Sequence, residues 1–139
     1  MGRILAIDYG KRNIGTALTD NLQMIPNPYV IIKNSGFNFV VKELQKIVKK
    51  KNVEHIVLGV PYTINGDETE NTKKIKQFYK KLSLLLKTPI SLFDEAFSTV
   101  DAYKILKKNG NSLKQSKERV DMVAACVILN NFLKTKNVW

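Results

Sequence analysis

The chain has 139 residues, of which 44% are hydrophobic, and it carries a formal net charge of +11. This length suits one domain, expected over 1–139, that buries a core without disulfides or a structural metal. One cysteine and one histidine exclude a disulfide framework and a Cys/His metal site, and no stretch is apolar enough for a membrane span or a signal segment, so we expect a cytoplasmic protein.

The positive charge indicates an anionic partner, with nucleic acid as the first candidate. Only Arg3, Arg12 and Arg119 are arginines among the 23 cationic residues. Because an AT-rich genome can also produce such an excess of lysine, the charge supports nucleic-acid binding without establishing it.

The first predicted strand is a buried apolar run that ends at Asp8. A polar turn over 9–13 leads into a returning strand over 14–19, so the pattern is a hairpin. A carboxylate at the end of a buried strand has two explanations. Asp8 can cap the turn by accepting hydrogen bonds from backbone amides, or it can bind a hard cation such as Mg²⁺ or Mn²⁺.

The following elements alternate between strands and amphipathic helices. We expect a short strand over 29–33, a helix from 37 to about 50, a strand over 56–60, a helix from about 70, and a strand over 90–93. This last strand leads into Asp94 and Glu95, which repeats the pattern seen at Asp8. Acids near the start of the helix at 70 are better explained by the helix dipole than by a second site.

Two further helices are predicted, over about 98–107 and 117–134. In the second, steps of three and four residues from Asp121 reach Ala124, Ala125, Ile128 and Phe132. The carboxylate therefore lies on the apolar stripe that should face the sheet, where an uncompensated charge is costly.

These elements predict an α/β fold with a five-stranded mixed sheet and helices packed on its faces. Asp8, the Asp94/Glu95 pair and Asp121 would then converge where the strands end, which is where open α/β sheets bind their ligands. Because carboxylates in close proximity repel one another unless a cation is present, we infer a site for Mg²⁺ or Mn²⁺, with two ions, and metal-dependent cleavage of phosphodiester bonds.

Four ordered segments carry a family resemblance: IDYGKRNIG, GVPYTINGDE, FDEAFSTVDA and ERVDMVAACVIL. In this order and spacing, across essentially the whole chain, they resemble the YqgF/RuvX family of RuvC-like proteins. The resemblance implies a ribonuclease H-like fold. It also implies a nuclease that processes the 5′ end of precursor 16S ribosomal RNA or, by the older assignment, resolves Holliday junctions in DNA.

The resemblance also implies the catalytic residues. The acid of the first strand corresponds to Asp8, that of the DER segment to Glu95 with Asp94 adjacent, and that of the last helix to Asp121. Because neighbouring strand residues face opposite sides, only one of Asp94 and Glu95 should bind the metal, and we favour Glu95. Where the family has the arginine of DER, this chain has Ala96.

Contacts to nucleic acid are expected around the same edge. Arg12 or Arg119 could bind the phosphate in place of the family's arginine, although either could equally be a surface arginine. Gly10 lets the first turn close near a phosphate, Lys11 lies beside it, and Tyr62 and Asn65 lie in a loop that follows a strand.

Three functions compete on these grounds. The first is the metal-dependent nuclease acting on structured RNA or branched DNA. The second is a catalytically idle nucleic-acid-binding or ribosome-associated module, which the alanine at the arginine position suggests. The third is a sugar-kinase or actin-like ATPase, whose two-domain cleft needs a longer chain. We favour a monomer, with a dimer left open because junction cleavage would require one.

Overall fold

The computed structural model describes residues 2–60, 68–94 and 113–136; within the last stretch it describes the side chains of 122–135. Five strands and, in the described part of the chain, three helices follow one another. They are β1 (Arg3–Asp8), β2 (Asn13–Thr19), β3 (Pro26–Lys33), α1 (Phe37–Lys51), β4 (Val53–Val60), α2 (Glu70–Leu85), β5 (Ile90–Asp94) and α4 (Leu113–Lys136). The predicted helix over 98–107 lies outside the described residues, and every other predicted element is confirmed.

The strands form one mixed sheet in the order β3-β2-β1-β4-β5. β1 is antiparallel to β2, and β2 to β3, whereas β4 runs parallel to both β1 and β5. Four strands therefore point the same way, and β1, β3, β4 and β5 all end at one edge of the sheet. We call this the carboxyl edge.

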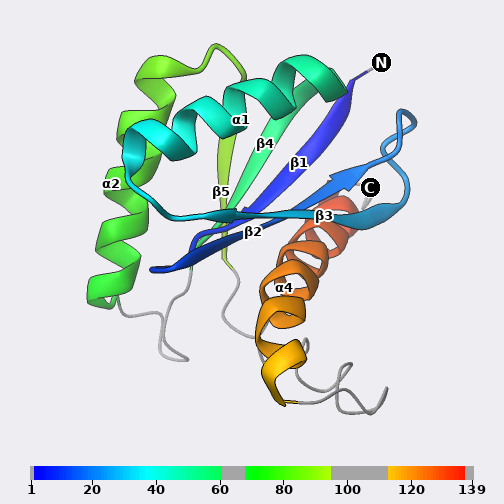
Figure 1. The fold of residues 1–139 in the computed structure, drawn as a ribbon. Coiled ribbons are helices and arrows are strands. Elements are labelled where there is room, and N and C mark those ends of the chain that lie inside the picture. Colours follow the sequence, from blue (N-terminus) through cyan, green and yellow to red (C-terminus); the bar gives the residue numbers. More distant parts are fainter. Residues whose placement is uncertain (1, 61–67, 95–112, 137–139) are drawn as a thin grey trace.

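Helices cover both faces of the sheet. Figure 1 shows α1 and α2 on one face and α4 on the other. Residues of β1 alternate between the two cores: Leu5 and Ile7 belong to the cluster under α1 and α2, and Ile4 and Ala6 to the cluster under α4. This double burial explains why β1 reads as a continuous apolar run.

Small residues bring α4 close to the sheet. Ala124 and Ala125 are buried, as are Ile128 and Leu129 one turn later, and this face packs against Ile4, Ala6, Ala17 and Val57. Burying a leucine or isoleucine side chain in this way stabilises the fold by about 1.5–3 kcal/mol. The stripe predicted from the spacing of the apolar residues is therefore confirmed.

Local signals end the helices. Asn52 takes a left-handed conformation (φ 53°) after α1, and its amide donates to the Val48 carbonyl oxygen. Thr69 caps α2: its hydroxyl accepts from the Thr72 amide at 3.2 Å, and the Thr72 hydroxyl accepts from the Thr69 amide at 3.1 Å. No helix in the described part of the chain is both long and apolar enough to span a bilayer.

The single cysteine and the single histidine are both half-buried. Cys126 borders an apolar hollow with Pro26 and Pro28, and its burial raises the pKa of the thiol. The Nε2 atom of His55 lies 2.8 Å from the Ser91 hydroxyl, and its ring contacts Phe132. Cys126 belongs to α4 and His55 contacts it, and the local sequence does not reveal how this helix packs on the sheet.

Candidate functional site

Asp8 is the last residue of β1, at the carboxyl edge. Because strand residues alternate, it shares the face of Ile4 and Ala6, which is the face that α4 covers. Its antiparallel partner is Gly15, so the residue directly opposite Asp8 on β2 has no side chain. The half-buried carboxylate offers the hard oxygen donors that a divalent cation prefers.

Asp94 ends β5 at the same edge but on the other face. Phe93 packs into the cluster under α4, whereas Ile90 packs against the cluster under α1 and α2. Alternation therefore assigns Asp94, which is exposed, to the face of α1 and α2, away from Asp8. Glu95 lies outside the described residues.

Asp121 lies in the third turn of α4, in a part of the helix whose side chains are not described. The amino end of α4 points toward the side of the sheet on which β1 and β5 end (Figure 1). The helix carrying Asp121 and the side chain of Asp8 are thus on one face of the sheet. Among the described side chains, no group of three or more His, Cys, Asp or Glu could hold a metal ion.

The turn after Asp8 carries three of the residues expected to contact nucleic acid. A Cβ atom on Gly10 would lie 2.2 Å from the Asn13 carbonyl oxygen, so this tight turn requires glycine. Lys11 and Arg12 are exposed. Of the other predicted contacts, Tyr62 and Asn65 lie outside the described residues, and Arg119 lies in α4 before the first described side chain.

Asn34, which follows β3, holds this turn in place. Its side-chain amide donates to the Gly10 carbonyl oxygen at 3.0 Å, and its backbone amide donates to the Arg12 carbonyl oxygen at 2.8 Å. Two segments that end at the carboxyl edge are thereby tied together, and the backbone of the turn is fixed on both sides of Lys11.

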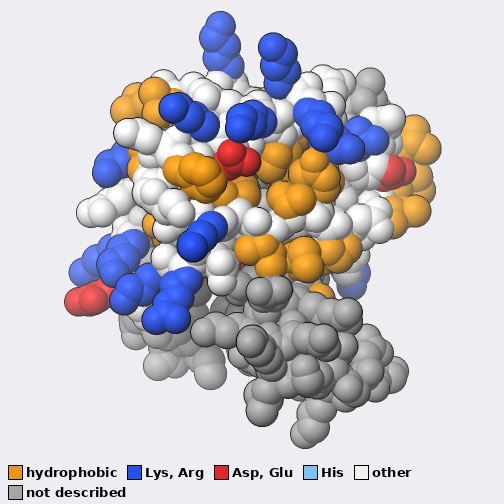
Figure 2. Space-filling view, viewed as in Figure 1, with side chains coloured by type: hydrophobic (Ala, Val, Ile, Leu, Met, Phe, Trp, Pro, Cys, Tyr) orange, Lys and Arg blue, Asp and Glu red, His pale blue; other side chains and the backbone are white. Residues whose placement is uncertain are grey.

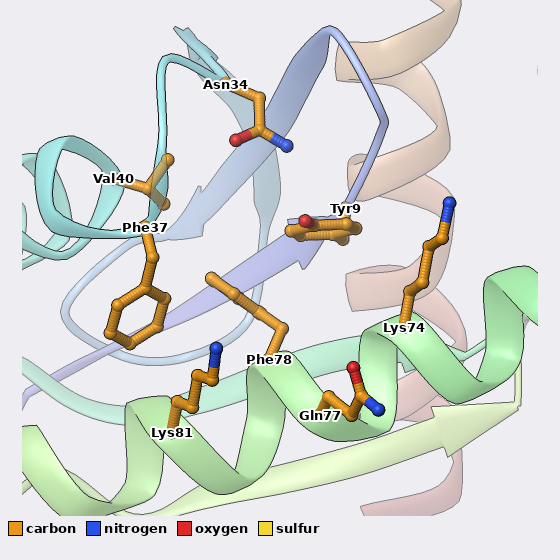
Figure 3. A pocket seen from close by; sticks show the side chains of 8 residues that line it. All are labelled: Tyr9, Asn34, Phe37, Val40, Lys74, Gln77, Phe78 and Lys81. Atoms are coloured by element: carbon orange, nitrogen blue, oxygen red, sulfur yellow. The ribbon is translucent and has the colours of Figure 1, made fainter.

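A hollow of about 160 Å³ opens beside the turn, on the face of α1 and α2. Figure 3 shows its lining, which comes from the end of β1, the loop after β3 and both helices: Tyr9, Asn34, Phe37, Val40, Lys74, Gln77, Phe78 and Lys81. An adjoining hollow of about 340 Å³ shares three of these residues and is lined by Tyr9, Lys11, Asn34, Glu70, Asn71 and Lys74.

Sequence reasoning missed most of this lining. One available signal was the spacing of Lys74, Phe78 and Lys81 along α2, which places one lysine on each side of an apolar residue on one helix face. Another was Asn34, a polar residue directly after a strand that ends at the carboxyl edge.

The surface around the hollows is positively charged. Helices α1 and α2, both described in full, carry ten lysines and only two acids, Glu43 and Glu70. Figure 2 shows Lys and Arg side chains spread over the part of the surface that these helices form. Glu68, just before α2, is one of the acids near the start of this helix, and a hydrogen bond from Lys76 lowers the pKa of its carboxyl.

Known proteins are similar to this chain over nearly its whole length. A family model described as "RuvX: Holliday junction resolvase" matches residues 2–135. A protein of Dictyoglomus turgidum named "Putative pre-16S rRNA nuclease" is 34% identical over 131 residues, covering 94% of this chain and 93% of its own. A Bacteroides fragilis protein of the same name is 33% identical over 141 residues, covering 99% and 100%.

Solved structures show the same fold. RuvC of T. thermophilus, in complex with a Holliday junction substrate, superposes with a TM-score of 0.62 at 10% identity and covers 96% of this chain and 95% of its own. The fowlpox virus resolvase, in complex with Holliday junction DNA, gives 0.61 at 15% identity with 98% and 99% covered. The predicted RuvC-like fold is confirmed.

Proposed function

Since this chain belongs to the RuvX family of nucleases, we propose that it hydrolyses phosphodiester bonds near the 5′ end of precursor 16S ribosomal RNA with the help of bound divalent cations. The family match over 2–135 supports the reaction class, and the names of relatives at 33–34% identity support the RNA substrate. The observation that carries the proposal is Asp8, a carboxylate at the carboxyl edge on the face that α4 covers.

The residues proposed to hold Mg²⁺ or Mn²⁺ are Asp8, Glu95 and Asp121. Asp8 fits this role because its carboxylate ends a rigid central strand and lies opposite a glycine. Asp121 is proposed because α4 lies on the same face of the sheet and begins at the same edge. When bound, such cations activate a water molecule and stabilise the leaving oxygen.

The geometry of β5 favours Glu95 over Asp94 as the third ligand. Asp94 is assigned to the face of α1 and α2, and one more residue of alternation would return position 95 to the face of Phe93 and α4. We therefore propose that Asp94 lies outside the metal site, although both acids were candidates in the sequence.

The residues predicted to contact nucleic acid would position the substrate. Lys11 and Arg12 are exposed on a turn held by Asn34, so they can meet a phosphate without reordering the backbone. Arg119, two residues before Asp121, is the second candidate to replace the cation missing at Ala96. Tyr62 and Asn65, which follow β4 in the sequence and lie outside the described residues, remain proposed contacts.

Cleavage of a 5′-extended 16S precursor, with and without Mn²⁺, tests this proposal. We expect Asp8→Asn, Glu95→Gln and Asp121→Asn each to reduce the rate by more than about 100-fold, since changes to outer-shell residues alone cost 10- to 100-fold. Asp94→Asn should retain most of the activity. Glu43→Gln, which removes one charge from the solvent-facing side of α1, is the matched control.

The presence of Ala96 in place of the family's arginine keeps a second function open, that of a catalytically idle module that binds ribosomal RNA. Metal-dependent cleavage that is abolished in Asp8→Asn would exclude it. Tight binding of the precursor without cleavage at any Mg²⁺ or Mn²⁺ concentration would instead establish it. Cleavage of a four-way DNA junction, but not of the RNA, would support the substrate named in the family description.

A further inference from the structure

We propose that the two adjoining hollows beside Tyr9 bind one unpaired nucleotide of the nucleic-acid strand, with its base in the smaller hollow and its phosphate in the larger. This inference rests on the proposed function, because it takes the strand that crosses the carboxyl edge as the ligand. It concerns the face of α1 and α2, on the other side of β1 from the proposed metal ligands.

The smaller hollow has an aromatic lining. The Tyr9 and Phe78 rings lie 4.7 Å apart between centroids at 41°, and the Phe37 ring meets Phe78 edge-on at 5.9 Å and 82°. In Figure 3 these rings gather around one space, with Asn34 and Gln77 on its border. Aromatic surfaces stack on bases, and side-chain amides offer donors and acceptors to base edges.

The size of this hollow suits a single ring system. Its volume is about 160 Å³, and an apolar cavity of roughly 150 Å³ is known to accommodate benzene. A single-ring base therefore fits in the smaller hollow, and a larger base can extend into the adjoining one, which has about 340 Å³.

The larger hollow has the charge expected of a phosphate site. Lys11 approaches it from the turn and Lys74 from α2, while Glu70 is the one acid in its lining. The lining thus carries one net positive charge, and Lys81, which lies 5.7 Å from the Phe37 ring centroid, adds another beside the smaller hollow. An anion bearing a flat aromatic group matches both hollows together better than a purely apolar ligand or a simple anion does.

The chain places this pocket next to the candidate site. Tyr9 directly follows Asp8, and alternation sends the two side chains to opposite faces of the sheet. A strand crossing the carboxyl edge at Asp8 could therefore insert a neighbouring nucleotide into the pocket. Packing against the core explains why Tyr9 contacts Phe78, but it does not explain why lysine and amide side chains line both hollows together with Tyr9.

The test is a binding experiment in Ca²⁺ buffer with a single-stranded RNA 12-mer that carries one 2-aminopurine. Its fluorescence reports base stacking, and anisotropy of an end label reports affinity. The variants are Tyr9→Leu, which keeps an apolar side chain but removes the ring, and Lys74→Gln. The control is Lys80→Gln, because Lys80 is exposed on the same helix and lines neither hollow.

We expect the wild-type protein to quench 2-aminopurine, and Tyr9→Leu to remove most of this quenching and weaken affinity about tenfold, within the range that base–aromatic stacking provides. Lys74→Gln should lower the slope of log K against log salt by about 0.7, the value for one phosphate contact on a single strand. Lys80→Gln should leave the quenching unchanged and alter the slope by less. Because Lys74 is exposed on a helix, its variant tests the proposal even if Tyr9→Leu does not fold.

Three results would overturn the proposal: unchanged quenching in Tyr9→Leu, equal effects of Lys74→Gln and Lys80→Gln, or displacement of the 12-mer by free AMP or CMP at similar concentrations, which would indicate a free-nucleotide site. Cleavage is scored separately. Asp8→Asn should abolish cleavage but keep the quenching. Cleavage without Tyr9-dependent quenching refutes the pocket alone, whereas Tyr9-dependent quenching without cleavage by the wild-type protein refutes the nuclease alone.

Discussion

The tightest contact around the β1–β2 turn predicts that Gly10→Ala destabilises the fold and weakens nucleic-acid binding together. The added methyl carbon would lie 2.2 Å from the Asn13 carbonyl oxygen, well inside the 3.0 Å limit below which backbone must shift. The turn cannot shift freely, because Asn34 donates hydrogen bonds to the carbonyl oxygens of Gly10 and Arg12.

The size of the effect follows from those bonds. Loss of two hydrogen bonds costs about 2 kcal/mol, and the lower entropy of the unfolded alanine chain offsets about 0.4–1 kcal/mol of this. We expect a net loss of about 1–2 kcal/mol. For a chain of this length, this corresponds to a decrease in Tm of roughly 3–7 °C.

Thermal unfolding and RNA anisotropy measure the two effects. Gly2→Ala is the matched control: its Cβ would lie 2.8 Å from the Asn52 carbonyl oxygen, a milder clash at the other end of β1. This variant should lower Tm without changing RNA affinity, whereas Gly10→Ala should lower both. If Gly10→Ala keeps the wild-type Tm and the wild-type affinity, the turn absorbs the methyl group and the reasoning is wrong.

Three further predictions concern the scaffold. Thr69→Ala removes the cap of α2 and should cost about 0.5–2 kcal/mol in urea unfolding, whereas Ser83→Ala near the other end of the helix should cost less. Ile128→Ala leaves a cavity between α4 and the sheet, and it should lower the free energy of unfolding by about 2–5 kcal/mol, again measured in urea. Asp20 accepts hydrogen bonds from the amides of Ile25 and Met24, which hold the pKa of its carboxyl below the ordinary value. The stabilisation that Asp20 contributes is therefore present above pH 4 and is lost as the pH falls through its lowered pKa. The difference in free energy of unfolding between the wild type and Asp20→Asn should therefore shrink from pH 6 to pH 3. A difference that stays constant would refute this.

Short-range patterns predicted the fold because each of them has a local cause. The apolar run before Asp8 reflects burial on both faces of β1, and the stripe from Ala124 to Phe132 reflects the side of α4 that meets the sheet. The same patterns brought Asp8 and the helix carrying Asp121 to one face. They could not say which face of the sheet Asp94 occupies, because that assignment depends on the packing of Phe93 against the cluster under α4.

The aromatic pocket could not be predicted in this way. Periodicity indicated that Phe37 and Phe78 face a core, but it does not indicate which residues of other elements they meet. Tyr9 joins them only because β1 lies at the centre of the sheet and ends beneath both helices. Contacts between segments that are distant in the sequence depend on the topology of the fold, and the spacing of residues within each segment does not predict them.

The outer strands of the described sheet have a consequence for assembly. β3 begins with Pro26 and Pro28, neither of which has an amide hydrogen to donate, and β5 at the opposite border has five residues. Both edge strands are therefore poor partners for a strand of another chain, which disfavours aggregation by edge-to-edge strand pairing at high protein concentration. If two copies cooperate on a branched substrate, they must meet through helices or loops rather than through a continuous intermolecular sheet.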